Sequence, residues 1–389
     1  MKMRKLAAVM LSGLMAFSLL TGCGSSSSEG AQSGSNESKE DAPVNVFENV
    51  KLLGRTYLSD DGKLWMGLSG TGADFDYTGD KLTLFIVGNA GGPKDRSRVG
   101  IYVDGERVKD FMAPSGGEMV DIEGKGSEPI NVKVVKLSEC AQSCCGISMM
   151  NLNGGTITPA AEKKHKIEII GDSITCGYGV DDEDANHSFS SSTEDCTKSY
   201  SIKTAELLDA DYTLVSFSGY GIISGYSGDG KKHADQLVPT YYSKYGFTYA
   251  AGFGSQKPQD IEWDFSKFVP EVIVINLGTN DASYTKSNAE KMDDYKTHYV
   301  EFLKDIRSKN ADARIYCTLG IMDTTLCETV KAAAEAYTAE TGDSNIRTFD
   351  FPIQNSAEDG IAADWHPSDK THTKSAELLA EFIKTDMGW

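Results

Sequence analysis

The sequence predicts a three-layer α/β domain with a parallel sheet and helices on both faces, preceded by an all-β, jelly-roll-like sandwich. Two observations support this order. From residue 46 to residue 160, short apolar runs rich in β-branched residues alternate with turns, and no helical period is visible. From residue 161 to residue 389, strand patterns alternate with amphipathic helical patterns, which indicates parallel strands joined by right-handed crossovers.

Residues 1–22 have the pattern of a lipoprotein export signal. Three basic residues precede an apolar run that ends at Leu20 and is too short to span a bilayer comfortably. The ending Leu-Thr-Gly-Cys resembles a bacterial lipobox, so a lipid on Cys23 would anchor the protein outside the cytoplasm, at the cell surface. Plain secretion with an incidental cysteine is the alternative. Residues 23–45 contain few apolar side chains and predict a flexible tether.

The sandwich prediction depends on short strand signals. Apolar runs at 82–87, 99–103 and 130–134 are separated by turn residues, and Asp104-Gly105 is a strong hairpin signal. This region contains no group of serine, histidine and acid that could act together in catalysis. We therefore expect the chemistry in the second region.

The second region contains five strand patterns and four helical patterns. The strands are expected at residues 165–170, 212–217, 272–277, 314–319 and 346–349. The helices are expected at residues 200–208, 288–307, 329–341 and 373–387. Ligands bind at the carboxyl ends of the strands in such sheets, so polar residues that follow these strands are the candidates for function.

The charge of the chain restricts its partners. The formal net charge is −19, and removal of the three positive charges in residues 1–22 leaves about −22. A strongly acidic surface repels phosphates and anionic headgroups, which argues against nucleic acid as a partner. An uncharged polysaccharide is compatible with this charge. We expect a monomer.

Cysteine and histidine positions give no metal pattern. Seven of the eight cysteines remain when Cys23 is set aside, so at least one thiol stays free or pairs between chains. Cys140, Cys144 and Cys145 lie close together without a nearby histidine to complete a zinc site, and a disulfide among them stays open. We expect no metal and no cofactor.

Four polar stretches lie at or just beyond the strand ends. They are Gly171-Asp172-Ser173, the run 216–221, the run 277–281 and Asp364-Trp365-His366-Pro367. Acyl transfer needs a nucleophile, a base, an acid that holds the base, and donors for the developing oxyanion. These stretches supply a residue type for every role.

The four stretches, in this order, resemble the blocks of the SGNH, or GDSL-type, hydrolase superfamily. The resemblance implies that Ser173 is the nucleophile and His366 the general base and then acid. Asp364 would orient the imidazole through its other ring nitrogen, which completes a triad. Two further acids have structural roles in this interpretation: Asp172 caps the turn that presents Ser173, and Asp281 binds local backbone.

The oxyanion hole implied by the same resemblance combines two backbone N–H groups and one side-chain amide. These belong to Ser173, Gly221 and Asn280. A glycine suits the second position because the backbone must approach the substrate closely. Gly219 is the alternative, but Gly221 keeps the family's spacing from the preceding strand.

The finer resemblance is to carbohydrate esterase family 2. It is carried by the runs 171–179, 264–270, 276–281 and 364–368, and by the sandwich ahead of the hydrolase region. Members of that family remove O-acetyl groups from plant cell-wall polysaccharides, often from O6 of a hexopyranose. The resemblance implies an acetylesterase of the acetylxylan or glucomannan type, with Tyr226 and Trp365 as aromatic walls that hold a sugar ring.

Two alternatives stay open at this point. The first is a lipid or thioester acyl hydrolase of the same superfamily, which would prefer long acyl chains. The second is a polysaccharide-binding surface protein whose pocket mainly holds glycans. The sequence does not distinguish the acetylated glycans from one another.

Overall fold

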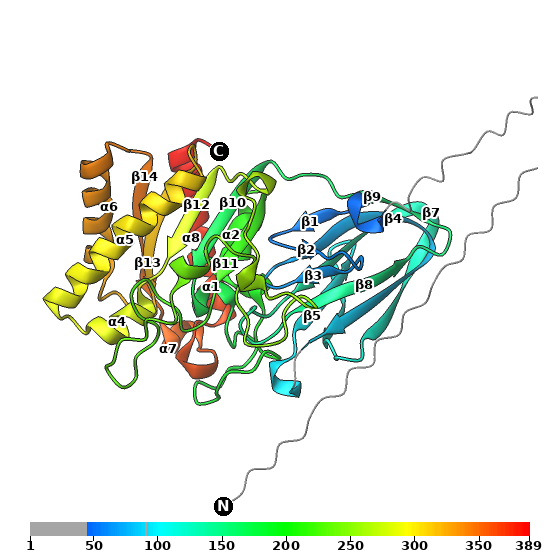
Figure 1. The fold of residues 1–389 in the computed structure, drawn as a ribbon, viewed down its shortest axis with the longest axis horizontal. Helices are drawn as coiled ribbons and strands as arrows, with labels where there is room; N and C mark the ends of the chain where they lie inside the picture. The colour runs from blue at the N-terminus through cyan, green and yellow to red at the C-terminus, as the bar shows by residue number, and fades with distance from the viewer. Residues whose placement is uncertain (1–44, 90–91) are drawn as a thin grey trace, which may run out of the picture. The chain divides into compact units, whose positions relative to one another are not determined.

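A computed structural model of the protein describes residues 45–89 and 92–389. The predicted export signal, Cys23 and nearly all of the predicted tether lie outside the described residues. Residues 45–389 form one compact unit (Figure 1). None of the helices in the described ranges combines the length and the apolar content that a bilayer crossing requires.

The first part of this unit is a nine-stranded antiparallel sheet. Its strands are β1 Lys51–Leu53, β2 Tyr57–Leu58, β3 Leu64–Met66, β4 Gly72–Gly88, β5 Arg98–Val103, β6 Glu106–Met112, β7 Glu118–Lys136, β8 Cys145–Asn151 and β9 Thr156–Pro159. The hydrogen-bonded order is β2-β3-β8-β4-β7-β5-β6, and β1 and β9 also pair with β4. Alternate side chains of the long strands, such as Phe75 and Val132, are buried in one core. Asp104 and Gly105 have positive φ at the β5–β6 turn, which confirms the predicted hairpin.

The second sheet is parallel and has five strands in the order β11-β10-β12-β13-β14. Its strands are β10 His165–Gly171, β11 Ala210–Ser216, β12 Val272–Asn276, β13 Arg314–Ile321 and β14 Ile346–Ile353. These positions confirm the five predicted strands. Strand β11 pairs with one side of β10, and β12 pairs with the other side. The loop after β10 and the loop after β11 therefore lead to opposite sides of β10, and ligands bind at such a point in α/β sheets.

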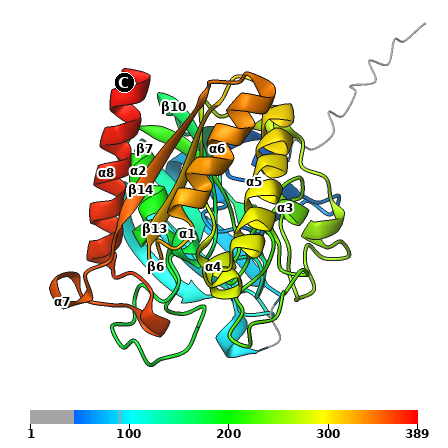
Figure 2. The same ribbon diagram turned by 90° about the vertical axis from the view of Figure 1, so that its left-hand side faces the viewer.

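Helices connect these strands. They are α1 Ser173–Cys176, α2 Tyr200–Leu207, α3 Val238–Tyr241, α4 Thr279–Thr285, α5 Ala289–Lys309, α6 Cys327–Thr341, α7 Ser356–Asp359 and α8 Asp369–Met387. Consecutive residues of β10 belong to different cores: Ile170 shares one with Tyr299 of α5, and Ile169 shares the other with Leu379 of α8. Figure 2 shows α5 and α6 side by side, with α8 apart from them. The two cores follow from the alternation of side chains along each strand.

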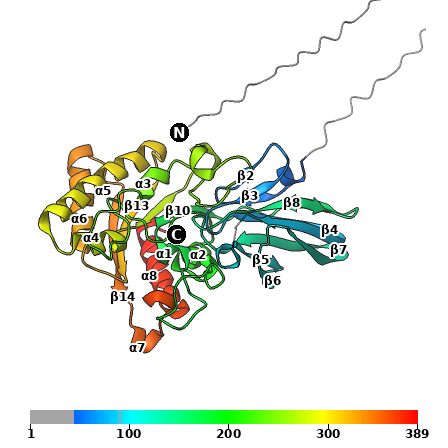
Figure 3. The ribbon, with the colours of Figure 1, turned by 60° about the horizontal axis from the view of Figure 1, so that its bottom comes forward.

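The two sheets are joined by buried polar contacts. Figure 3 shows the strands of the nine-stranded sheet together, with the loops that follow β10 and β11 next to them. Arg55, from the loop between β1 and β2, is fully buried and pairs with Glu168 of β10 at 3.0 Å. The same guanidinium donates to the carbonyl oxygen of Lys244 at 2.8 Å. Seven cysteines in the described part of the chain are buried free thiols, and the Sγ atoms of Cys140 and Cys144 lie 3.8 Å apart.

Candidate active site

Ser173 lies at the point where β10 ends and α1 begins. The Asp172 carboxylate accepts a hydrogen bond from the Ile174 N–H at 3.0 Å and caps the first turn of this short helix. This contact confirms the predicted structural role of Asp172. Burial raises the pKa of Asp172 to about 7. The cap fixes the turn, so the Ser173 hydroxyl stands at the carboxyl end of β10, an interior strand of the parallel sheet.

His366 meets Ser173 from the other end of the chain. It follows the 3-10 helix η6 (Ala363–Trp365), and its Nε2 lies 2.8 Å from Ser173 Oγ. Burial lowers the pKa of His366 to about 4. The imidazole is therefore neutral near pH 7 and can accept the serine proton. The sequence predicted this pair, and the fold brings it into hydrogen-bond contact.

The position of Asp364 differs from the prediction. His366 Nδ1 lies 3.1 Å from the backbone carbonyl oxygen of Asp364 and 3.3 Å from that of Ala363. The left-handed backbone of Asp364, with φ 51° and ψ 39°, presents this carbonyl to the ring. The Asp364 carboxylate instead accepts a hydrogen bond from the Tyr178 hydroxyl at 3.3 Å. The predicted triad contact between the carboxylate and the imidazole is thus replaced by contacts to backbone carbonyls.

Tyr178 is a site residue that the sequence analysis did not assign. Its ring stacks on the imidazole of His366, with ring centroids 3.9 Å apart and planes inclined by 21°. The signal that could have identified it is its place between two glycines, Gly177 and Gly179, directly after the nucleophile helix. The stack fixes the plane of the imidazole from one side.

The prediction that Gly221 donates to the oxyanion does not fit this geometry. Its N–H already donates to the carbonyl oxygen of Gln236 at 3.1 Å. Position 221 requires glycine for packing, because a Cβ there would lie 2.2 Å from the carbonyl oxygen of Ser224 and 2.5 Å from an oxygen of Asp281. Glycine is therefore needed at position 221 because the chain segments around it approach one another closely.

Gly219, the alternative named from the sequence, has the geometry that a donor needs. Its φ is 81°, and a Cβ at this position would meet no atom within 4 Å. Within residues 45–89 and 92–389, the N–H groups of Gly219 and Ser173 donate to no protein acceptor. Both N–H groups remain available for an oxyanion.

Asn280 and Asp281 open helix α4 and act on the neighbouring loop. Asn280 Nδ2 donates to the carbonyl oxygen of Tyr220 at 2.8 Å and lies 3.4 Å from an oxygen of Asp172, so one of its two N–H groups is only weakly engaged. The Asp281 carboxylate accepts N–H groups from residues 222–224 at 2.8–3.1 Å. Asp281 thus binds backbone groups, as predicted, but those of a loop 57 to 59 residues earlier in the chain and not of its own neighbourhood.

The two aromatic residues predicted to hold a sugar ring are both exposed. Tyr226 is 62% exposed, and its N–H donates to the carbonyl oxygen of Gly219 at 2.8 Å. Trp365, directly before His366, is 61% exposed. The backbone thus links Tyr226 to Gly219 and Trp365 to His366. Across the described ranges, no three His, Cys, Asp or Glu side chains lie close enough together to hold a metal ion.

The hydrolase region matches a known family. Residues 169–374 match the model of the GDSL-like lipase/acylhydrolase family, which covers more than half of the chain. The protein belongs to this family. Residues 52–161 match the model described as carbohydrate esterase 2 N-terminal. The chain therefore has the SGNH hydrolase fold with an N-terminal, mostly-β domain.

Relatives and solved structures agree with this assignment. The cellulase/esterase CelE of Acetivibrio thermocellus is 29% identical over 358 residues, which cover 90% of this chain and 41% of CelE. The chain thus spans less than half the length of that relative. An acetylxylan esterase/glucomannan deacetylase of Cellvibrio japonicus is 26% identical over 88% of this chain and 90% of its own. A family two carbohydrate esterase from Clostridium thermocellum, solved in complex with cellohexaose, has 28% identity and a TM-score of 0.75, with coverage of 87% of this chain and 99% of that chain.

Proposed function

We propose that this protein is a serine esterase that removes O-acetyl groups from plant cell-wall polysaccharides. The observation that carries the proposal is the 2.8 Å contact between Ser173 Oγ and His366 Nε2 at the carboxyl end of β10. The similarity to an acetylxylan esterase/glucomannan deacetylase supports an acetylated glycan as the substrate. A 6-O-acetyl hexose is the finer proposal for the reacting unit.

The reaction proceeds through an acetyl-enzyme. The Ser173 hydroxyl attacks the acetyl carbonyl carbon while His366 Nε2 takes its proton. The negative charge that develops on the carbonyl oxygen is stabilised by the N–H groups of Ser173 and Gly219 and by the amide of Asn280. His366 then protonates the departing sugar oxygen, and a water molecule, deprotonated by the same imidazole, releases acetate.

His366 carries a positive charge during each proton transfer. Its Nδ1–H faces the backbone carbonyl oxygens of Asp364 and Ala363, which accept a hydrogen bond and hold the ring. Burial disfavours the charged imidazolium, while the nearby Asp364 carboxylate favours it. The carboxylate therefore acts through its charge and through Tyr178.

Tyr226 and Trp365 would hold the sugar ring. Both are more than half exposed. Trp365 directly precedes His366, and the Tyr226 N–H donates to the carbonyl oxygen of Gly219 at 2.8 Å. Aromatic side chains bind the apolar faces of sugar rings without any charge, which agrees with a strongly acidic, glycan-compatible surface.

The test is acetate release from acetylated xylan and acetylated glucomannan. Aryl acetate and aryl octanoate are measured beside them, with Ser173→Ala as the control. Acetate release that disappears in Ser173→Ala supports the proposal and ranks the two glycans. Faster turnover of the octanoate without activity on either glycan would assign the protein to the lipid or thioester hydrolases instead.

Asn280→Ala tests the oxyanion hole within the same assay. Loss of one such donor lowers turnover by about 10²–10³-fold in serine hydrolases. We expect that range for Asn280→Ala, and unchanged turnover would remove Asn280 from the mechanism.

We also propose that the protein is a monomer, held outside the cytoplasm by lipid on Cys23. The support is the basic, apolar and Leu-Thr-Gly-Cys pattern of residues 1–23. Cys23→Ala should release the protein from the membrane fraction of a bacterium that processes lipoproteins. Retention of the variant in that fraction would contradict the anchor, and light scattering of the released protein measures its oligomeric state.

For the fold, we propose two finer features. The five-stranded sheet is the middle of three layers, with helices on both faces, and the nine-stranded sheet is a jelly-roll-like sandwich. The separate cores of Ile169 and Ile170 support the first feature, and the long, continuous strands β4 and β7 support the second. A crystal structure tests both.

A further inference from the structure

Two buried glutamates, Glu139 and Glu194, lie where the N-terminal β domain meets the hydrolase domain. Glu139 belongs to the loop between β7 and β8, and Glu194 lies two residues before the 3-10 helix η3 (Cys196–Lys198). Both side chains are at most 1% exposed. Burial of a carboxyl group is costly unless its oxygens accept hydrogen bonds, so the position of these groups requires an explanation. The mechanism described above uses neither.

The contacts of Glu139 lead directly to the oxyanion hole. The Ser218 N–H donates to Glu139 Oε2 at 2.9 Å. Ser218 precedes Gly219, whose free N–H is one of the three oxyanion donors. The Glu139 carboxyl group is therefore the acceptor that holds the loop at the residue before this donor, and it comes from the other domain.

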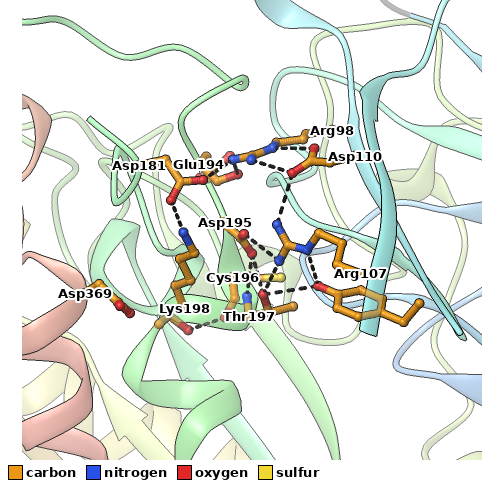
Figure 4. Close-up of polar contacts among 12 residues, drawn as sticks. Arg98, Arg107, Asp110, Asp181, Glu194, Asp195, Cys196, Thr197, Lys198 and Asp369 are labelled. Carbon is orange, nitrogen blue, oxygen red and sulfur yellow. Dashed lines mark hydrogen bonds and ion pairs between the residues drawn. The ribbon is translucent and has the colours of Figure 1, made fainter. Parts of the chain in front are cut away.

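Glu194 holds Glu139 in turn. The Glu139 N–H donates to Glu194 Oε2 at 2.8 Å. The segment around Glu194 is fixed to the β domain by two arginines (Figure 4). Arg98 of β5 pairs with Asp181 at 2.6 Å, and Arg107 of β6 pairs with Asp195 at 2.7 Å. The acceptor for Ser218 is thus built into a network of contacts between the two domains.

Glu139 does not need a negative charge to accept the hydrogen bond from the Ser218 N–H. Burial raises the pKa of Glu139, against the opposing effects of the hydrogen bond from Ser218 and of the buried Lys136 ammonium. Burial and the adjacent Glu139 raise the pKa of Glu194. The Lys136 ammonium is itself bound to the carbonyl oxygens of Ser138 and Glu139 at 2.5 and 2.7 Å. A neutral carboxyl group still offers a carbonyl oxygen to the Ser218 N–H.

We propose that Glu139 is a positioning residue of the oxyanion hole, through which the N-terminal β domain holds the Ser218–Gly219 segment in its productive position. The proposal rests on the esterase function proposed above. It gives the β domain a direct part in turnover, because an oxyanion donor must lie within a few tenths of an ångström of its productive position to be effective.

Asn89 provides a matched control. Its Oδ1 accepts the Cys144 N–H at 2.8 Å, and its Nδ2 donates to the carbonyl oxygen of Gly252 in the hydrolase domain. Like Glu139, it ties the β7–β8 loop to the hydrolase domain. Unlike Glu139, it reaches a loop that contains none of the oxyanion donors. Asn89→Ala therefore removes a contact between the domains without touching the site.

The experiment compares Glu139→Ala, Glu139→Gln and Asn89→Ala in the whole chain. Active serine is counted with a fluorophosphonate, so that kcat refers only to folded sites. We expect Glu139→Ala to lower kcat on aryl acetate by about 10- to 100-fold, with KM within about twofold. Inhibition by a phenylboronic acid, whose adduct places an oxygen in the oxyanion hole, should weaken by a similar factor. Glu139→Gln, which keeps an acceptor oxygen, and Asn89→Ala should stay within about threefold of the wild type in kcat.

Hydrogen exchange supplies a readout that does not depend on esterase activity. We expect faster exchange in the peptide that covers residues 217–221 for Glu139→Ala but not for Asn89→Ala. The proposal is overturned if Glu139→Ala matches Asn89→Ala in kcat and in this exchange, or if Glu139→Gln loses as much kcat as Glu139→Ala. A wild-type protein that hydrolyses no ester would refute the proposed function, while the exchange of residues 217–221 would still decide whether Glu139 holds the loop.

Discussion

At the scale of single residues, the imidazole of His366 is held between an aromatic ring and two backbone carbonyls. Tyr178 covers one face of the ring at a centroid distance of 3.9 Å. Aromatic stacking contributes about 0.5–1.5 kcal/mol beyond surface burial, which corresponds to about 2- to 13-fold in rate if it is lost in the transition state. We expect Tyr178→Leu to lower kcat in that range and Tyr178→Phe, which keeps the ring, to stay within about twofold. Equal losses in both variants would show that the hydroxyl contact to Asp364, not the stack, matters.

The Asp364 carboxylate does not contact the imidazole, so its replacement should be mild. In triads whose aspartate accepts the imidazole N–H, exchange for asparagine lowers kcat by about 10⁴-fold. We expect Asp364→Asn to cost less than about 10-fold here, because the carbonyl oxygens that face Nδ1 belong to the backbone and remain. Asparagine also tolerates the left-handed backbone at this position. A loss near 10⁴-fold would show that the carboxylate swings onto the imidazole during catalysis.

The buried state of His366 predicts an unusual acid limit. The imidazole must be neutral to accept the Ser173 proton, and burial lowers its pKa to about 4 from an ordinary 6.5. Plotted against pH, kcat/KM should therefore stay high down to about pH 4 and fall below it. Because the Asp364 charge raises the pKa of His366, Asp364→Asn should move this limit to lower pH. A midpoint near 6.5, or a shift to higher pH in the variant, would contradict this account.

At the scale of elements, the short helix α4 supports the loop that carries Gly219. Asp281 in its first turn accepts N–H groups from residues 222–224. Asp281→Ala would leave these buried donors without an acceptor, at about 1–3 kcal/mol for each unsatisfied group. We expect a loss of at least about 2 kcal/mol in the free energy of unfolding, measured by urea denaturation, together with reduced kcat. Asp281→Asn, which retains one acceptor oxygen, serves as the control and should lose less.

At the scale of the whole molecule, the two domains share a buried ion pair between Arg55 and Glu168 of strand β10. Removal of one partner of such a pair typically costs about 3–5 kcal/mol, because the other charge stays buried and unpaired. We expect Arg55→Ala to lower the free energy of unfolding by about that amount. The double variant Arg55→Met with Glu168→Gln should recover part of the loss, since it leaves no unpaired charge. Additive losses in the double variant would mean that the two side chains are not coupled.

Contacts between the two domains also make the β domain part of the structure that holds the active site. Arg55, Glu139 and Asn89 all come from the N-terminal β domain and all bind loops or strands of the hydrolase domain. Arg55 reaches strand β10, and Glu139 reaches the loop that carries Gly219. The geometry of the site is therefore a property of residues 45–389 as one unit.

The sequence by itself determined the elements and the reacting pair. Continuous apolar runs such as residues 272–275 predict buried parallel strands, and all five strands were confirmed, because side-chain pattern is encoded locally. Ser173 was a candidate because it directly follows a predicted strand, and the resemblance to the SGNH superfamily gave Ser173 and His366 their roles. Helix α4 escaped prediction because seven residues are too few to show a helical period.

Only the tertiary structure decided which groups are free to act. Gly221 has its N–H bound to Gln236, while Gly219 does not, and no local pattern separates the two. The Asp364 carboxylate turns to Tyr178, 186 residues earlier in the chain, and Ser218 is held by Glu139, 79 residues before it. The physical reason is that a hydrogen-bonding group is free only if the fold brings no partner to it. Such a partner can lie far away in the chain, so the neighbouring residues do not predict it.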